Sequence, residues 1–377
     1  MKKILKKENI KKTRELMKKL FLVMLFLVLT LGCAALPPIK IPQITEANLP
    51  PQCYIEGIKI IKRPRLKNPY LIVAWPGMGE VAFKAATYLI EQLKAELFAQ
   101  IPAEEFFYLT GSIIREGVLT VPQLPESRFY YWKNKTGKND LIIFISDAQP
   151  DLSKAESYSK KIIHLAKTFK VEMIISLASM PQPIDHTQNS GVWFASTSLE
   201  LNNSLKKYNF NLLSEGQISG MNGLFLGIAQ KEGFKGICLL GEIPLYTIQI
   251  ANPRASLAVL SALGKILNIQ IDFTGLTEQT HILENEINKL LDYLKLGPPG
   301  QAAPIGEEEI EKIKKTLSQL TKLPVSIKEK IEKLFGEAKS DLSQANILKS
   351  ELDKWNVYKE YEDRFLDLFR KKKGKDN

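Results

Sequence analysis

Two side chains in this chain of 377 residues occupy positions suited to acid–base chemistry. Glu242 lies just beyond the short apolar run 236–240, which is typical of a buried strand and is ended by Gly241 and Pro244. A carboxylate past the C-terminal end of a strand lies where open α/β sheets bind their ligands. His186 lies in a polar loop and could shuttle protons. The alternative is that Glu242 is a loop residue that hydrogen-bonds to backbone.

No recognised catalytic set accompanies these two residues. The sequence has no Gly-x-Ser-x-Gly turn, and no Ser/His/Asp order stands out. The three histidines are scattered, and Cys33, Cys53 and Cys238 form no pair with metal-ligand spacing. Cys238 lies in the apolar run and is expected to be a buried small hydrophobe. The sequence therefore predicts no metal site and no cofactor, and it favours a protein that is not an enzyme.

A glycine-rich turn, Pro76-Gly77-Met78-Gly79, follows an apolar strand and precedes a helix. This arrangement can cradle a phosphate at a helix N-terminus. The spacing lacks the third glycine of a dinucleotide fingerprint, and Glu80 would repel a phosphate. A tight turn packed against neighbouring loops is the favoured interpretation.

Strands and helices alternate along the central part of the chain. Apolar runs predict strands at 70–75, 141–145, 172–178 and 236–240, and helical periodicity predicts helices at 81–97, 155–169, 254–267 and 278–294. We expect a three-layer α/β/α sandwich with a mainly parallel sheet. Short β segments are predicted at 106–111 and 117–121, and an aromatic strand at 128–133 that belongs to the core or to a subunit interface, rather than stacking on nucleic-acid bases.

The loops that end the predicted strands should meet at one edge of such a sheet. They are 76–79, 147–150, 179–183 and 241–244. The candidates for a pocket or interface at this edge are Pro76, Gly77, Gly79, Asp147, Pro150, His186, Asn222, Gly223, Glu242, Pro244 and Tyr246.

The net charge of +11 is concentrated at the two ends of the chain. Residues 1–19 hold nine Lys or Arg and two Glu (+7), and residues 370–377 hold five Lys or Arg and one Asp (+4), so the remainder is neutral (11 − 7 − 4 = 0). A nucleic-acid surface needs clustered cations, and the folded part is not expected to provide one.

Residues 1–33 have the pattern of an export signal. Lys18 and Lys19 precede the apolar run 20–31, and small residues follow it. Leu29 to Cys33 resembles a lipoprotein box, which makes Cys33 the candidate for lipid attachment and a membrane tether; an uncleaved anchor is the alternative. We expect a signal-like segment at 1–33, a Pro-rich tether at 34–52, an α/β domain at 53–296, a linker at 297–306, and a helical arm with a basic tail at 307–377.

Four short motifs resemble the proteasome assembly chaperone 2 family. They are Pro-Gly-Met-Gly-Glu-Val at 76–81, Gly-Gln-Ile-Ser-Gly-Met-Asn-Gly-Leu at 216–224, Leu-Leu-Gly-Glu-Ile-Pro-Leu-Tyr at 239–246 and Asn-Pro-Arg-Ala-Ser at 252–256. The resemblance covers roughly residues 54–294, and the arm looks like an extension found in prokaryotic members. It implies an α/β/α sandwich similar to phosphorylase and hydrolase folds.

The resemblance also implies a function: no established catalysis, self-association into homo-oligomers, and binding of a protein partner. The family's C-terminal hydrophobic-Tyr-X sequence is not found at residues 373–377, and the signal-like N-terminus departs from the cytoplasmic location that the family implies. We therefore expect a non-catalytic, assembly-chaperone-like protein that is exported and anchored, or cytoplasmic as its relatives are. The alternative function is a hydrolase or phosphorylase acting on a nucleoside-like molecule at the strand ends.

Overall fold

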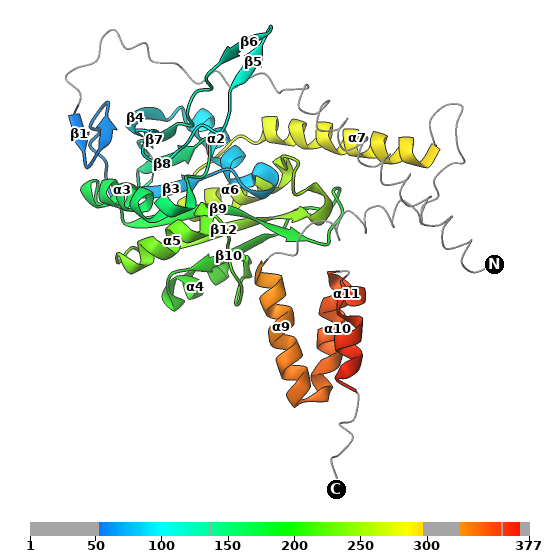
Figure 1. Cartoon of the computed structure of the whole chain (residues 1–377). Helices are drawn as coiled ribbons and strands as arrows, with labels where there is room; N and C mark the ends of the chain where they lie inside the picture. The colour runs from blue at the N-terminus through cyan, green and yellow to red at the C-terminus, as the bar shows by residue number, and fades with distance from the viewer. Residues whose placement is uncertain (1–52, 136, 297–324, 356, 370–377) are drawn as a thin grey trace. The chain divides into compact units, whose positions relative to one another are not determined.

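The computed structural model describes residues 53–135, 137–296, 325–355 and 357–369 (Figure 1). The signal-like segment with Cys33, the tether and the linker that were expected from the sequence lie outside these residues. Within the described ranges, no helix combines the length and the apolar character needed to cross a membrane.

A ten-stranded mixed sheet organises residues 53–296. Across the sheet, the strands follow the order β1 (Cys53–Ile55), β2 (Ile58–Ile60), β4 (Glu96–Ile101), β7 (Ser127–Trp132), β8 (Leu141–Ser146), β3 (Tyr70–Ala74), β9 (Met173–Gln182), β12 (Gly236–Pro244), β10 (Val192–Ser196) and β11 (Asn211–Leu212). Two further strands, β5 (Ile113–Arg115) and β6 (Val118–Thr120), form a separate antiparallel hairpin.

The centre of the sheet is parallel and its flanks are largely antiparallel. Strands β8, β3, β9 and β12 run in one direction, whereas β1, β2, β4 and β7 alternate and β10 opposes β12. Five of the nine pairings in this sheet are antiparallel, so the expected mainly parallel sheet holds for the centre and not for the flanks. The reason is connection length: a two-residue turn, Glu56-Gly57, joins β1 to β2 with both φ angles positive, and so short a link permits only antiparallel pairing.

Helices cover both faces of the sheet, which confirms the three-layer arrangement. On one face lie α2 (Val81–Leu93) and α6 (Pro253–Leu267), with α7 (Thr274–Leu296) packed on α6. On the other lie α3 (Ala155–Thr168) and α5 (Met221–Lys231). A further helix, α4 (Leu199–Leu205), contacts β10.

Alternate side chains of β3 belong to different cores. Ile72 and Ala74 pack with α2 and α6, whereas Leu71 and Val73 pack with α3 and α5. Trp75, directly after the strand, is fully buried in the second core. This two-sided burial explains why the sequence of β3 is a continuous apolar run rather than an alternating one.

The aromatic strand β7 is part of the core, as predicted. Phe129, Tyr130 and Tyr131 are buried, and the ring centroid of Phe129 lies 4.7 Å from that of Phe144. Arg128 is also buried and pairs with Asp147 at 2.5 Å. These side chains are therefore not exposed for stacking on bases.

Two predictions between β3 and β7 are wrong. The helix predicted to reach Leu97 ends at Leu93, because Lys94 adopts a left-handed conformation (φ 50°) and the chain continues as β4. The β segment predicted at 106–111 is not a strand; Phe106 instead packs edge-on against Tyr158, with ring centroids 4.9 Å apart.

The C-terminal arm contains α9 (Val325–Ser340), α10 (Ala345–Lys354) and α11 (Tyr358–Asp367), which pack on one another. Their buried side chains include Ile331, Phe335, Ala338, Leu348, Leu352, Trp355 and Phe365. Helix α9 continues through Gly336. Arg364 of α11 forms a bidentate ion pair with Glu332 of α9, with N–O distances of 2.6 and 2.5 Å.

Candidate functional site

The C-terminal ends of the four parallel strands meet at one edge of the sheet, as the sequence predicted. Strands β3 and β8 end at Ala74 and Ser146, but β9 and β12 continue as a pair to Gln182 and Pro244. The loops predicted at 179–183 and 241–244 are therefore largely strand. Gly241 and Pro244 do not end β12, because β9 pairs with it in register as far as the Pro244–Gln182 position.

Asn222 fixes the turn that follows β3. It lies in the first turn of α5, is 5% exposed, and its amide bonds to Trp75 at both ends: Nδ2 donates to the Trp75 carbonyl at 3.0 Å, and Oδ1 accepts from the Trp75 N–H at 2.9 Å. The Ser176 hydroxyl also donates to the Asn222 carbonyl. The predicted site residue thus satisfies buried backbone groups and is not available to a ligand.

Gln149 adds a second clamp on the same turn. Its Nε2 donates to the carbonyl of Pro76 at 2.8 Å, and its Oε1 accepts from the backbone N–H of Met221 at 3.1 Å. The loop after β8 is thereby joined to the turn after β3 and to the start of α5. Pro76, Gly77 and Asn222, predicted separately, lie together here; a Cβ on Gly77 would lie 3.4 Å from Asn222 Nδ2.

Glycine is favoured at position 79 by a positive φ angle and at position 223 by a close backbone approach. Gly79 has φ 63°, donates its N–H to the Ile248 carbonyl at 2.7 Å and accepts from the N–H of Asn252 at 2.8 Å. A Cβ on Gly223 would lie 2.1 Å from the carbonyl oxygen of Ile218. Only glycine fits at position 223 without a backbone shift, and glycine adopts the left-handed conformation of position 79 at the least cost. The sequence interpretation of a tight turn packed on neighbouring loops is consistent with this geometry.

Glu242 has the hydrogen-bonding role named as its alternative. Its Oε2 accepts from the Gly191 N–H at 2.9 Å and its Oε1 accepts from Trp193 Nε1 at 2.6 Å, while its own N–H donates to the Gly191 carbonyl at 3.0 Å. The carboxylate therefore holds the segment that leads into β10 against β12. Its contacts and those of His186 have no residue in common.

Asp147 and Pro150 support the loop after β8. Asp147 accepts from Arg128 at 2.5 Å and from the N–H of Glu126 at 3.1 Å, and Pro150 is buried. Asp147 thereby neutralises the buried Arg128, whose charge would be costly without a partner.

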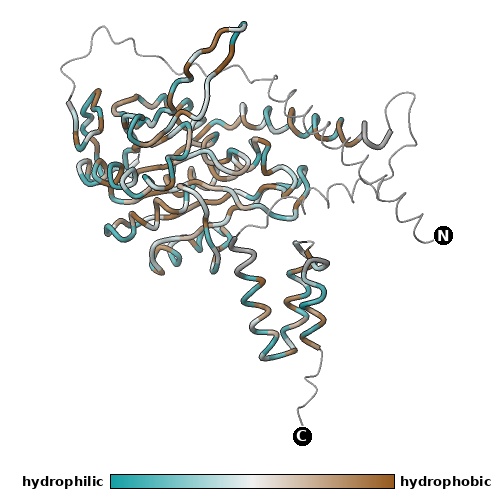
Figure 2. Tube along the Cα trace, in the orientation of Figure 1, coloured by the Kyte–Doolittle hydropathy of each residue, from teal (hydrophilic) through white to brown (hydrophobic). Residues whose placement is uncertain are grey.

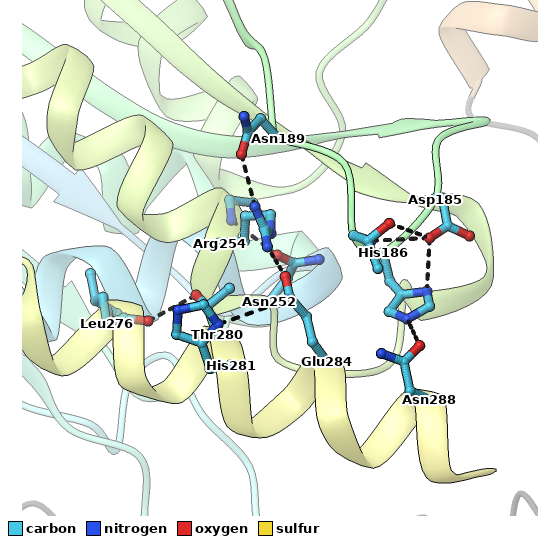
Figure 3. Close-up of polar contacts among 12 residues, drawn as sticks. Asp185, His186, Asn189, Asn252, Arg254, Leu276, Thr280, His281, Glu284 and Asn288 are labelled. Atoms are coloured by element: carbon cyan, nitrogen blue, oxygen red, sulfur yellow. Dashed lines mark hydrogen bonds and ion pairs between the residues drawn. The ribbon is translucent and has the colours of Figure 1, made fainter. Parts of the chain in front are cut away.

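His186 and Tyr246 lie in one polar cluster with α7, and Figure 3 shows His186 with Asp185 and with Asn288 of α7. The Tyr246 hydroxyl is 2.9 Å from His186 Nδ1 and accepts from the His186 N–H at 2.7 Å, while His186 Nε2 is 2.9 Å from Asn288 Oδ1. Asp185 Oδ1 lies 3.2 Å from Nδ1. With its ring 5% exposed and both ring nitrogens engaged, His186 joins the loop after β9 to α7.

Arg254 was not predicted as a site residue, although it lies in one of the four motifs. It donates to Asn189 Oδ1 at 2.9 Å and forms an ion pair with Glu284 of α7 (Figure 3). Partial burial lowers the pKa of Arg254. A sequence signal was present, because a cation in the first turn of a helix opposes the helix dipole and requires a carboxylate partner. Asn252 caps the same helix, accepting from the Ala255 N–H at 2.9 Å, as its position before Pro253 indicated.

The arrangement offers no recognisable nucleophile with its base. Burial raises the pKa of Cys238 to about 12, so its thiol is inert at neutral pH. In the described part of the chain, no group of three His, Cys, Asp or Glu side chains is placed to hold a metal ion. The edge is instead a network that ties the loops after β3, β8, β9 and β12 to the starts of α5 and α6.

Comparison with known proteins identifies relatives of this architecture. The model of the PAC2 family matches residues 71–291. The chain is similar to the structure of Pyrococcus furiosus PbaB, an archaeal proteasome activator, with 31% identity and a TM-score of 0.54 over 62% of this chain and 97% of that one. It is also similar to P. furiosus PbaA, an archaeal homolog of proteasome-assembly chaperone, with 26% identity and a TM-score of 0.50 over 70% and 99% of the two chains.

A relative among curated proteins extends the match to a second archaeon. An uncharacterised protein of Methanocaldococcus jannaschii is 28% identical over 265 residues, which is 68% of this chain and 98% of that protein. The family match contains every candidate residue from Pro76 to Tyr246, and helices α9, α10 and α11 lie beyond it.

Proposed function

We propose, because this chain belongs to the PAC2 family, that it is a non-catalytic protein-binding protein with an assembly-chaperone-like role, and that it self-associates. The partners to test first are subunits of a proteasome. This choice is supported by the similarity to PbaB, an archaeal proteasome activator, and to PbaA, a homolog of proteasome-assembly chaperone.

One observation carries the non-catalytic part of the proposal: the side chains best placed for chemistry are engaged in hydrogen bonds within the fold. Glu242 accepts from Gly191 and Trp193, and Asn222 bonds to both backbone groups of Trp75. His186 is bonded through both ring nitrogens. A protein whose edge is built this way presents a rigid surface, which suits recognition of another protein.

A capture experiment tests this function. The tagged full chain is recovered from native cells, and the bound proteins are quantified by mass spectrometry. We expect enrichment of proteasome α-type subunits or their precursors over a tag-only control, and direct binding of the purified chain to those subunits. Failure of both, together with turnover of a metabolite, would reject the proposal.

A second arm of the experiment tests the alternative hydrolase or phosphorylase. Glu242→Gln and His186→Ala are assayed for turnover of nucleosides and for partner binding. No observation on the described residues favours this alternative, so we expect neither the wild type nor the variants to turn over these compounds. Turnover that the wild type supports and Glu242→Gln abolishes would instead favour it.

The location of the chain decides which partners it meets, and we propose that its N-terminus tethers it to a membrane. The basis is the sequence of residues 18–33 alone. Labelled palmitate should be incorporated into the wild type and into Cys238→Ser, but not into Cys33→Ser. Unprocessed, unlabelled protein in the soluble cell fraction would reject the tether and favour the cytoplasmic alternative.

A further inference from the structure

The segment from Tyr108 to Val121 is the most apolar exposed part of the α/β domain. Every one of its residues is exposed, and it contains the hairpin β5–β6. Figure 1 shows this hairpin extending away from the sheet, and Figure 2 shows hydrophobic colouring along it. Its seven large apolar side chains are 40–73% exposed: Tyr108, Leu109, Ile113, Ile114, Val118, Leu119 and Val121.

One face of the hairpin concentrates this apolar surface. Ile114 and Leu119 are directly paired across the two strands and are 68% and 70% exposed. Val121 follows β6 directly and is 73% exposed. Leaving three such side chains in water is unfavourable, and contiguous apolar surface of this kind marks an interaction site.

The hairpin has a firm base despite its exposed tip. Phe106 and Phe107 are buried, with ring centroids 4.9 and 6.1 Å from that of Tyr158 in α3. The N–H of Asp151 donates to the carbonyl of Phe106 at 3.1 Å. Substitutions at the tip should therefore leave the fold of the domain intact.

The apolar and charged side chains of the hairpin suit a contact with the same hairpin of a second copy. The seven side chains lie on both faces of the hairpin, so the face of Ile114 and Leu119 supplies only part of the roughly 800 Å² that each partner buries in a standard specific interface. The charged residues within 108–121 are Arg115 and Glu116. This neutral pair is self-complementary in a two-fold contact, where the Arg of one copy can meet the Glu of the other.

The hairpin gains stability from a partner. In the described residues β5 and β6 pair with each other and with no other strand, and a two-stranded hairpin alone is marginally stable in water. A second copy packed on its apolar face would remove that face from water. A lipid surface is less well matched, because the segment carries a single cation.

We propose that residues 108–121 of one chain pack against the same residues of a second copy, through the face that holds Ile114 and Leu119. This contact rests on the self-association that forms part of the proposed function, and it assigns that self-association to one element. A lipid surface and a contact elsewhere on the chain are the outcomes that would contradict it.

The test compares two variants of the full chain by sedimentation. Ile114→Ser combined with Leu119→Ser removes the apolar pair, and Leu199→Ser removes a leucine that is 80% exposed on α4. We expect the wild type and Leu199→Ser to sediment as oligomers of the 42.6 kDa chain, and the double variant to dissociate with a Kd at least about 100-fold higher. The circular dichroism spectra should be the same for all three proteins, because the substitutions lie outside the core of the domain.

Each other result has a distinct meaning. If the double variant keeps the wild-type mass, the hairpin contact is wrong and self-association stands. If the wild type remains a single chain at the highest concentration reached, both self-association and the hairpin contact are wrong, and partner binding is judged by the capture experiment. If vesicles bind the wild-type monomer but not the double variant, the hairpin is a lipid contact instead.

Discussion

At the scale of single residues, Asn222 is the side chain on which the sheet edge depends most. Asn222→Ala leaves the buried N–H and carbonyl of Trp75 without partners, so we expect the free energy of unfolding to fall by about 2–4 kcal/mol. Urea unfolding measures this. The control is Gln149→Ala, where water can replace the lost bonds of an exposed side chain and the loss should be under about 1 kcal/mol. Equal losses in the two variants would show that the buried amide is not the stronger clamp.

Two glycines in α5 provide a matched pair for a second prediction. A Cβ on Gly223 would lie 2.1 Å from the Ile218 carbonyl oxygen, whereas a Cβ on Gly227 would meet nothing within 4 Å. Gly223→Ala should therefore lower the thermal midpoint, with a stability loss of more than about 2 kcal/mol. Gly227→Ala should raise stability by about 0.5–1 kcal/mol, since alanine favours the helix. If both variants are stabilised, the backbone approach at Gly223 is not as close as described.

The sequence could indicate these residues but not their partners. Strand-end positions predicted that Glu242, Asp147 and Pro76 lie at one edge of the sheet, since parallel strands end at a common edge. The partners of Glu242 are a backbone N–H and an indole N–H, 51 and 49 residues away along the chain. Pairings at that sequence separation leave no local pattern, so the structural role of the carboxylate could not be derived from its position.

At the scale of elements, the central strands and their helices were predictable and the flanks were not. A buried parallel strand such as β3 has a continuous apolar sequence that can be recognised without its neighbours. Strand β4 was missed because the helix before it ends at Lys94, a residue that gives no stop signal of the kind that glycine gives. The antiparallel pairing of β4 with β7 joins segments some thirty residues apart, and no sequence period encodes it.

The contact between α9 and α11 gives a prediction about pH. Hydrogen bonds from Arg364 lower the pKa of Glu332 below its ordinary value. A carboxyl group with a lowered folded-state pKa stabilises the fold above its unfolded pKa, and this contribution is lost as the pH falls through the folded pKa. Both side chains are partly exposed, so solvent screening keeps the effect below about 1 kcal/mol.

The measurement is the unfolding of the wild type and Glu332→Gln at pH 6 and at pH 3. The stability difference between the two proteins should be present at pH 6 and smaller at pH 3. Glu286→Gln, on α7 and outside this contact, is the control. An equal difference at both pH values would mean that the charge of Glu332 is not what stabilises the contact.

At the scale of the whole molecule, the charge distribution predicts how the chain binds polyanions. The ends 1–19 and 370–377 carry the entire net charge of +11. Replacing their Lys and Arg residues with Gln should abolish salt-dependent binding to DNA, because no counterions are then displaced. Binding measured against salt concentration tests this. A variant that keeps the wild-type salt dependence would place a cationic surface on residues 20–369.

The α/β domain and the C-terminal helices each enclose a tryptophan. Trp75 is fully buried, with the rings of Phe144 and Phe225 at 5.2 and 5.5 Å, and Trp355 is 2% exposed among the helices of the arm. Indole emission shifts to longer wavelength when water reaches the ring. The chain has four tryptophans, Trp75, Trp132, Trp193 and Trp355. Proteins that retain Trp75 alone or Trp355 alone would report separately, without any attached dye, on whether the sheet and the helices melt in one step or in two.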